Sequence, residues 1–174
     1  MGIAFSSIKR LLSISILVTL VLFLLPGPSA AADDPDRALP EILSAAESLF
    51  LAMKHRDYPA VWRLTTAASK AAIVNDTFRA IEGSGGKPVP KEEIRRDFDA
   101  SGPISSRYWD GFLERFDPDL VLERSRWEKG RIDPDSAEIL ITGKAASMPA
   151  RLKLFREDGG WKVGLAETFW GRKD

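Results

Sequence analysis

The chain has 174 residues, with 25 Lys and Arg against 25 Asp and Glu, and it contains no cysteine. Without cysteine the chain can form neither disulfides nor thiolate metal sites, and it cannot carry a lipid on a cysteine. The balanced charge does not supply the basic domain or stripe that nucleic-acid binding requires, so we expect no nucleic-acid partner.

The first 32 residues have the order of features of a secretory signal peptide. Lys9 and Arg10 precede an apolar run from Leu11 to Leu25, and small residues follow up to Ala32. The apolar run has 15 residues, whereas a membrane-spanning helix needs about 20. Cleavage near Ala32 is therefore favoured over retention as an anchor. We expect a periplasmic or secreted protein, with a membrane contact only if the segment is kept.

Helical periodicity follows a short polar stretch. Residues 33–38 are polar and acidic, and we therefore expect them to form a short disordered segment, or lead, before the first helix. From Leu39 to Met53 apolar residues recur at steps of three and four, which predicts an amphipathic helix. Asp57 is a suitable N-cap for a second helix, and Pro59 suits its first turn. Further helices are predicted at 69–81, 91–100 and 104–116, with a glycine- and proline-rich loop at 82–90.

From Asp119 the apolar period changes to two, which predicts strands. Four strands are expected, at 119–130, 136–145, 150–157 and 161–170. Asp158, Gly159 and Gly160 predict a tight hairpin turn between the last two. Helices followed by four hairpin-linked strands predict an α+β fold. Its N-terminal helices are expected to pack on one face of a four-stranded antiparallel sheet, in a single domain over residues 39–174.

Two stretches resemble a known superfamily. The segment LFLAMKHRDYPAVWRLTT (49–66) resembles the first two helices of the nuclear transport factor 2-like, or cystatin-like, superfamily, and FREDGGWKVG (155–164) resembles its last hairpin in secreted members of unknown role. The likeness covers the order of elements over residues 39–170, with a long segment at 83–101 as a departure. It implies a cone-shaped domain whose curled sheet wraps around the helices. Members include isomerases, dehydratases, transport factors and noncatalytic modules, so the likeness does not select a function.

Two residues, Glu167 and His55, are candidates for catalysis. A catalytic cone needs a carboxylate or a His–Asp pair in an apolar hollow. In the expected last strand Glu167 shares a face with the apolar residues Trp161, Val163, Leu165 and Phe169. The alternative is a solvated charge at a strand end. His55 is the single histidine and could shuttle protons, but it lies at the polar end of the first predicted helix.

No metal or cofactor is expected, because one histidine and no cysteine leave only oxygen ligands, and no acidic loop with calcium-binding spacing occurs. Aromatic side chains are the candidates for lining a ligand hollow, with core packing as the alternative. These candidates are Tyr58, Trp62, Trp127 and Phe169.

The sequence thus favours an exported, noncatalytic binding or interaction module for a small molecule or a protein. One alternative is a small cofactor-free enzyme, isomerase-like or dehydratase-like, that transfers a proton through Glu167. Another is a membrane-tethered accessory domain. A homodimer formed through the sheet is also compatible with the sequence.

Overall fold

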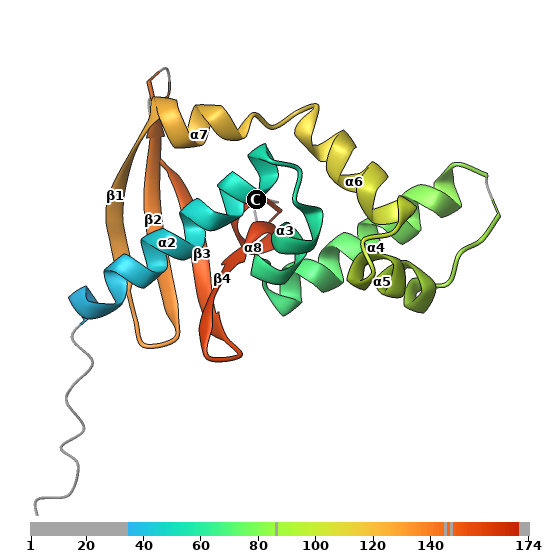
Figure 1. Cartoon of the computed structure of the whole chain (residues 1–174), viewed down its shortest axis with the longest axis horizontal. Helices are drawn as coiled ribbons and strands as arrows, with labels where there is room; N and C mark the ends of the chain where they lie inside the picture. Colours follow the sequence, from blue (N-terminus) through green and yellow to red (C-terminus); the bar gives the residue numbers. More distant parts are fainter. Residues whose placement is uncertain (1–34, 86, 145, 147, 171–174) are drawn as a thin grey trace, which may run out of the picture. The chain divides into compact units, whose positions relative to one another are not determined.

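A computed structural model describes residues 35–85, 87–144, 146 and 148–170. The expected signal peptide lies outside the described residues. The described chain forms helices first and strands second, as predicted (Figure 1). The helices before the sheet are α2 (Pro35–Lys54), α3 (Tyr58–Leu64), α4 (Ala67–Gly83), α5 (Lys91–Asp99), α6 (Pro103–Leu113) and α7 (Pro118–Arg124). Then come β1 (Ser125–Ile132), β2 (Ser136–Gly143), β3 (Ala150–Glu157), β4 (Gly160–Gly164) and α8 (Leu165–Phe169). No helix in the described ranges has the length and apolar character needed to cross a membrane.

The first two helices are separated where the sequence predicts. The side chain of Asp57 accepts a hydrogen bond from the backbone N of Ala60 at 3.1 Å, and Pro59 lies in the first turn of α3. Helix α2, however, begins at Pro35 and not at Leu39, so residues 35–38 are helical and not a disordered lead. A proline is tolerated in a first helical turn because its missing N–H would have no partner there.

The four strands form one antiparallel sheet in the order β1-β2-β3-β4. Buried residues alternate along the strands as predicted, with Ile139 on β2, Leu152 and Leu154 on β3, and Val163 on β4. These residues lie on one face, where Ile139 pairs with Leu152 and Leu154 pairs with Val163. Asp158 and Gly159 both have positive φ, 53° and 76°, and close the predicted hairpin. The fold is therefore α+β with an antiparallel sheet. The sheet is not strongly curled, in contrast to the expected cone (Figure 1).

Two predicted strand segments are helices. Residues 118–124 form α7, because Asp117 caps this helix by accepting a hydrogen bond from the backbone N of Asp119 at 2.9 Å. Residues 165–169 form α8, so the last strand ends at Gly164. The backbone N of Lys153 on β3 donates a hydrogen bond to the hydroxyl of Thr168 at 3.0 Å, so a side chain of α8 and not a strand carbonyl is its acceptor. The prediction of strand at both places was wrong.

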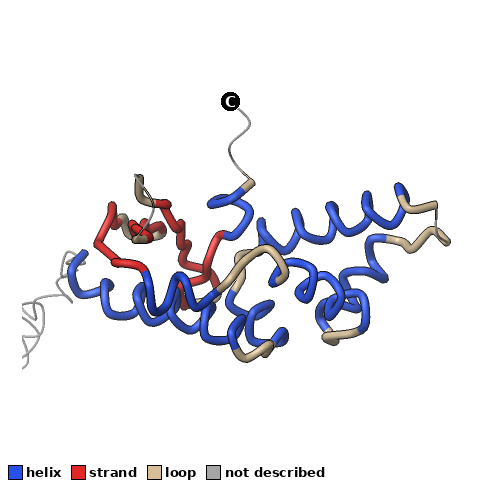
Figure 2. The backbone as a smooth tube through the Cα atoms, turned by 90° about the horizontal axis from the view of Figure 1, so that it is seen from above, coloured by secondary structure: helices blue, strands red, loops and turns tan. Residues whose placement is uncertain are grey.

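Helix α2 joins the sheet to the rest of the helices. It contacts β1 and β4 and also packs on α3 and α7. Figures 1 and 2 show the strands at one side of this domain and α4, α5 and α6 at the other. Apolar side chains of α2 are fully buried against the sheet side chains, among them Ile42, Ala46, Leu49 and Phe50.

A continuous run of ring contacts extends from the sheet into the helices. Phe50 lies 5.8 Å from Trp127 of β1 and 5.9 Å from Phe116, measured between ring centroids. The run continues at 4.7–5.8 Å between neighbouring rings through Phe112, Trp109, Tyr108, Phe98 and Trp62. Aromatic pairs at such distances stabilise a core beyond the area they bury. One core therefore serves both the sheet and the helices.

The end of β4 allows a test of packing. A Cβ at Gly164 would lie 2.9 Å from Cε2 of Phe155 and 3.0 Å from Cδ of Glu167. We expect Gly164→Ala to lower the free energy of unfolding by about 1–3 kcal/mol, the usual cost of overpacking. Chemical denaturation measures this change.

Gly143→Ala is the matched control, because a Cβ there meets nothing closer than Oγ of Ser125 at 3.9 Å. Equal stability losses in the two variants would contradict the packing argument for Gly164.

Candidate functional site

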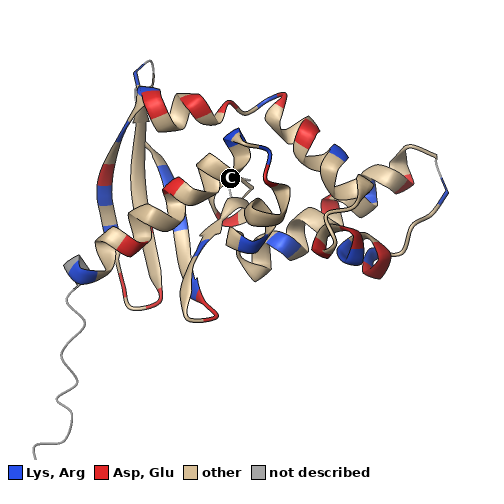
Figure 3. Ribbon diagram, in the orientation of Figure 1, with Lys and Arg blue, Asp and Glu red and all other residues tan. Residues whose placement is uncertain are grey.

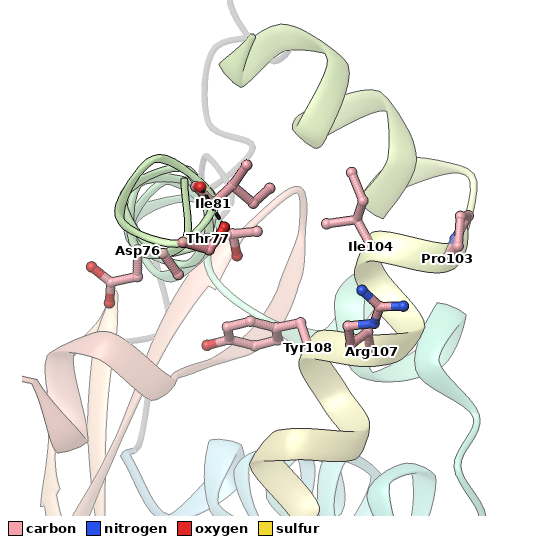
Figure 4. Close-up of a pocket in the computed structure, with 9 residues that line it drawn as sticks. Asp76, Thr77, Ile81, Pro103, Ile104, Arg107 and Tyr108 are labelled. Carbon is pink, nitrogen blue, oxygen red and sulfur yellow. Dashed lines mark hydrogen bonds between the residues drawn. The ribbon is translucent and has the colours of Figure 1, made fainter. Parts of the chain in front are cut away.

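A cleft of about 640 Å³ lies between α4 and α6 (Figure 4). Thr77 and Ile81 on α4 face Ile104 and Tyr108 on α6 across the cleft. The remaining lining includes Asp76, Ala80, Ser84, Pro103 and Arg107. The lining is mostly apolar with a few polar groups, which is typical of small-molecule sites.

The chain positions the two walls by local capping. Thr66 caps α4 by accepting a hydrogen bond from the backbone N of Ser69 at 3.1 Å. At the other wall, the carboxylate of Asp97 on α5 accepts a hydrogen bond from the backbone N of Ser105 at 2.8 Å. This bond fixes the start of α6 against the end of α5, because the first amides of a helix have no partner within the helix.

Tyr108 is the central polar residue of the cleft. Its ring belongs to the aromatic run, and its hydroxyl is directed toward α4 (Figure 4). Burial raises the pKa of Tyr108 well above its ordinary value, and the nearby carboxylate of Asp76 raises it further. The phenol therefore stays protonated at neutral pH and can donate a hydrogen bond.

The other polar groups of the cleft differ in their partners. Asp76 forms an ion pair with Arg79 one turn along α4. Arg107 is exposed, and its guanidinium has no hydrogen-bond or ion-pair partner among the described residues. Thr77 is 8% exposed, and its buried hydroxyl oxygen likewise has no hydrogen-bond partner in the described structure.

Glu167 lies outside the α4–α6 cleft, in a hydrogen-bonded network at the start of α4. Its carboxylate accepts hydrogen bonds from the hydroxyl of Thr66 at 2.9 Å and from the hydroxyl of Ser69. The Ser69 hydroxyl in turn accepts the bond from the backbone N of Ala166 at 2.8 Å. A negative charge is also favoured at a helix N-terminus. These contacts give Glu167 a structural role in joining α8 to α4.

His55 lies in the turn between α2 and α3 and is exposed. Its imidazole has no hydrogen-bond partner among the described residues, and the bonds of Glu167 go to Thr66 and Ser69. The two catalytic candidates are therefore not brought together as a hydrogen-bonded pair.

Tyr58 and Trp62 are buried on α3 and hold neighbouring helices. The hydroxyl of Tyr58 donates to Asp110 of α6, and burial, together with that bond, raises the pKa of Tyr58. The indole N–H of Trp62 donates to Asp99 of α5 at 2.8 Å. Neither residue lines the α4–α6 cleft.

Trp127 and Phe169 lie nearer the sheet. The indole N–H of Trp127 donates to the carbonyl of Val121 at 3.0 Å, and its ring packs on Phe50. Phe169 is 47% exposed and lines a separate hollow of about 350 Å³ with Met148. The four predicted lining residues thus do not share one cavity.

Charged side chains of both signs are distributed over the described helices and strands. Figure 3 shows Lys and Arg interspersed with Asp and Glu along the helices and strands. Within the described ranges, no group of three His, Asp or Glu side chains is placed to hold a metal ion.

The cleft residues were not identified from sequence. Ile104 and Tyr108 belong to a predicted apolar helix face, and Ile81 belongs to another. Their spacing of three and four residues shows that each helix has an apolar side. It does not show that these two sides face each other and leave space between them.

Comparisons with protein-family models, with curated proteins and with solved structures find no match to this chain.

The network around Glu167 predicts a loss of stability on removal of one hydroxyl. Ser69 is fully buried and bonds both Glu167 and the backbone of Ala166. We expect Ser69→Ala to lower the free energy of unfolding by about 1–3 kcal/mol, because a carboxylate and an amide each lose a partner. Chemical denaturation measures the change. Ser106→Ala in α6, where no side-chain hydrogen bond exists in the described structure, is the matched control, and equal losses would contradict the role of Ser69.

The two tyrosines predict how stability changes at alkaline pH. The chain has only Tyr58 and Tyr108, and both have raised pKa values in the folded state. In the unfolded chain a tyrosine ionises at about pH 10. Above that pH the unfolded state holds fewer protons than the folded state, so the free energy of unfolding falls as pH rises. Stability from this source is fully present below about pH 10.

Phenolate absorbance and circular dichroism, followed together against pH, test this expectation. Phenolate should appear together with loss of helix, and Tyr108→Phe should weaken the decline in stability. Ionisation of both tyrosines near pH 10 in a protein that remains folded would contradict it.

Proposed function

We propose that this domain is a noncatalytic binding module that holds the apolar part of a small molecule in the cleft between α4 and α6. The volume of about 640 Å³ supports this function, because small-molecule pockets have volumes of roughly 300–1,000 Å³. Opposed apolar side chains, Ile81 and Ile104, provide the walls (Figure 4). Tyr108 provides a polar group on a ring that is held by its aromatic neighbours.

The chemistry of the lining supports binding over catalysis. Proton transfer needs an acid or base within reach of the substrate. The one carboxylate in the lining, Asp76, is ion-paired with Arg79. Glu167, which could serve an isomerase-like reaction, is bonded to two hydroxyls outside the cleft. A binding role therefore accounts for more of the described contacts than an enzymatic one.

We also propose a family for the domain and an exported location for the protein. Membership of the nuclear transport factor 2-like superfamily is supported by the helix-then-sheet order and by the last hairpin at Asp158 and Gly159. An exported location is supported by the signal-peptide features of residues 1–32.

Filling the cleft tests the binding function. Ala80 lines the cleft and is exposed, so Ala80→Trp places a large ring in it without disturbing the core. We expect N-phenylnaphthylamine, a neutral apolar fluorophore, to bind the unchanged protein with increased fluorescence. Binding to Ala80→Trp should be at least about tenfold weaker, because loss of apolar contact of about 1.4 kcal/mol suffices for that factor.

Ala71→Trp is the matched control. Ala71 is also exposed on α4, and nine residues from Ala80 place it on the opposite side of the helix. Equal dye binding by Ala80→Trp and the unchanged protein would overturn the proposed site.

A further inference from the structure

The cleft has charged groups of opposite sign at its two sides. Asp76 lies on the α4 side, near the hydroxyl end of Tyr108, and Arg107 lies on the α6 side near Ile104 (Figure 4). The negative charge of Asp76 is compensated by Arg79. No acidic side chain pairs with Arg107 among the residues that the structure describes. The uncompensated charge of the cleft is therefore positive.

The uncharged polar groups of the cleft add donors. The hydroxyls of Tyr108 and Thr77 have no hydrogen-bond partner within the described chain. A tyrosine hydroxyl that stays protonated is a donor, and an arginine guanidinium has five N–H donors and no acceptor. A ligand that complements this set carries acceptor oxygens and a negative charge.

Between these polar groups the walls are apolar. Ile81 and Ile104 point toward each other above the ring of Tyr108 (Figure 4). A ligand that fills the cleft thus needs a hydrocarbon part next to its anionic group. A single unpaired arginine matches the single charge of a carboxylate, whereas phosphate carries up to about two charges and three acceptor oxygens at neutral pH.

We propose that the cleft binds an amphiphilic carboxylate, whose carboxylate pairs with Arg107 while its hydrocarbon chain lies between Ile81 and Ile104. This inference rests on the binding function proposed above. Arg107 selects the head group, and the apolar walls supply the part of the affinity that does not depend on charge.

Three probes with the same chain and different head groups test the inference: decanoate, decanol and decyltrimethylammonium, each kept below its micelle concentration. Dissociation constants come from NMR titration of the backbone amides of α4 and α6. We expect decanoate to bind roughly fivefold more tightly than decanol, as an exposed ion pair of about 1 kcal/mol allows, and the cationic probe to bind most weakly.

The variants identify the residue responsible. Arg107→Gln should bind decanoate and decanol equally, whereas Arg107→Lys should keep most of the preference for decanoate. Arg95→Gln removes another exposed arginine, from α5, and should leave the preference unchanged. Circular dichroism checks that each variant is folded.

The remaining outcomes separate the two proposals. Equal binding of decanoate and decanol to the unchanged protein, or an unchanged preference in Arg107→Gln, would overturn the carboxylate inference and leave the binding function intact. If none of the three probes and no N-phenylnaphthylamine binds, the binding function itself is overturned, and the carboxylate inference with it.

Discussion

The helical and sheet parts of this domain are connected by α2 and by the docking of the α3–α4 junction on the end of β4, and the start of α4 depends on that docking. Thr65 bridges Val163 in parallel, and the backbone N of Thr66 donates to the carbonyl of Val163 at 3.1 Å. Glu167 then ties the start of α4 to α8 through Thr66 and Ser69. The hydroxyl of Thr66 also accepts a hydrogen bond from the backbone N of Ser69, and the hydroxyl of Ser69 accepts one from the backbone N of Ala166. The first turns of α4 and α8 are therefore joined through shared hydroxyl groups. Buried polar groups are costly when unpaired, which makes this arrangement specific.

The cleft depends on that junction and on the aromatic run. Helix α4 forms one wall, and its direction is set where it leaves Thr66. Helix α6 forms the other wall, and it is held from behind because Tyr108 packs on Phe98 at 5.5 Å and on Trp109 at 5.1 Å. A wall that is fixed by core packing loses little freedom when a ligand binds, and such preorganisation favours affinity. The site thus combines a rigid floor with side chains that are still free to bond.

Glu167 was a catalytic candidate because a strand was expected to place it on an apolar face, and in the structure that strand ends at Gly164. Strand alternation placed it on an apolar face with Trp161 and Val163, but it lies in α8. Its environment is polar, with Thr66 and Ser69 as hydrogen-bond donors. These partners are 101 and 98 residues away from Glu167 in the sequence. No local pattern can reveal a bond of that separation.

The sequence by itself determined the helical and strand periods, the cap at Asp57, the hairpin at Asp158 and Gly159, and the alternation of β2 and β3, because these follow from interactions between near neighbours. The helix at residues 118–124 also follows from a near-neighbour interaction, the cap at Asp117, although the apolar alternation of these residues predicted a strand. Tertiary structure decided where β4 ends, the helical state of residues 165–169, and the space between α4 and α6. An apolar period predicts that a face will be buried, but the partner of that face, and any gap left beside it, result from packing over the whole domain.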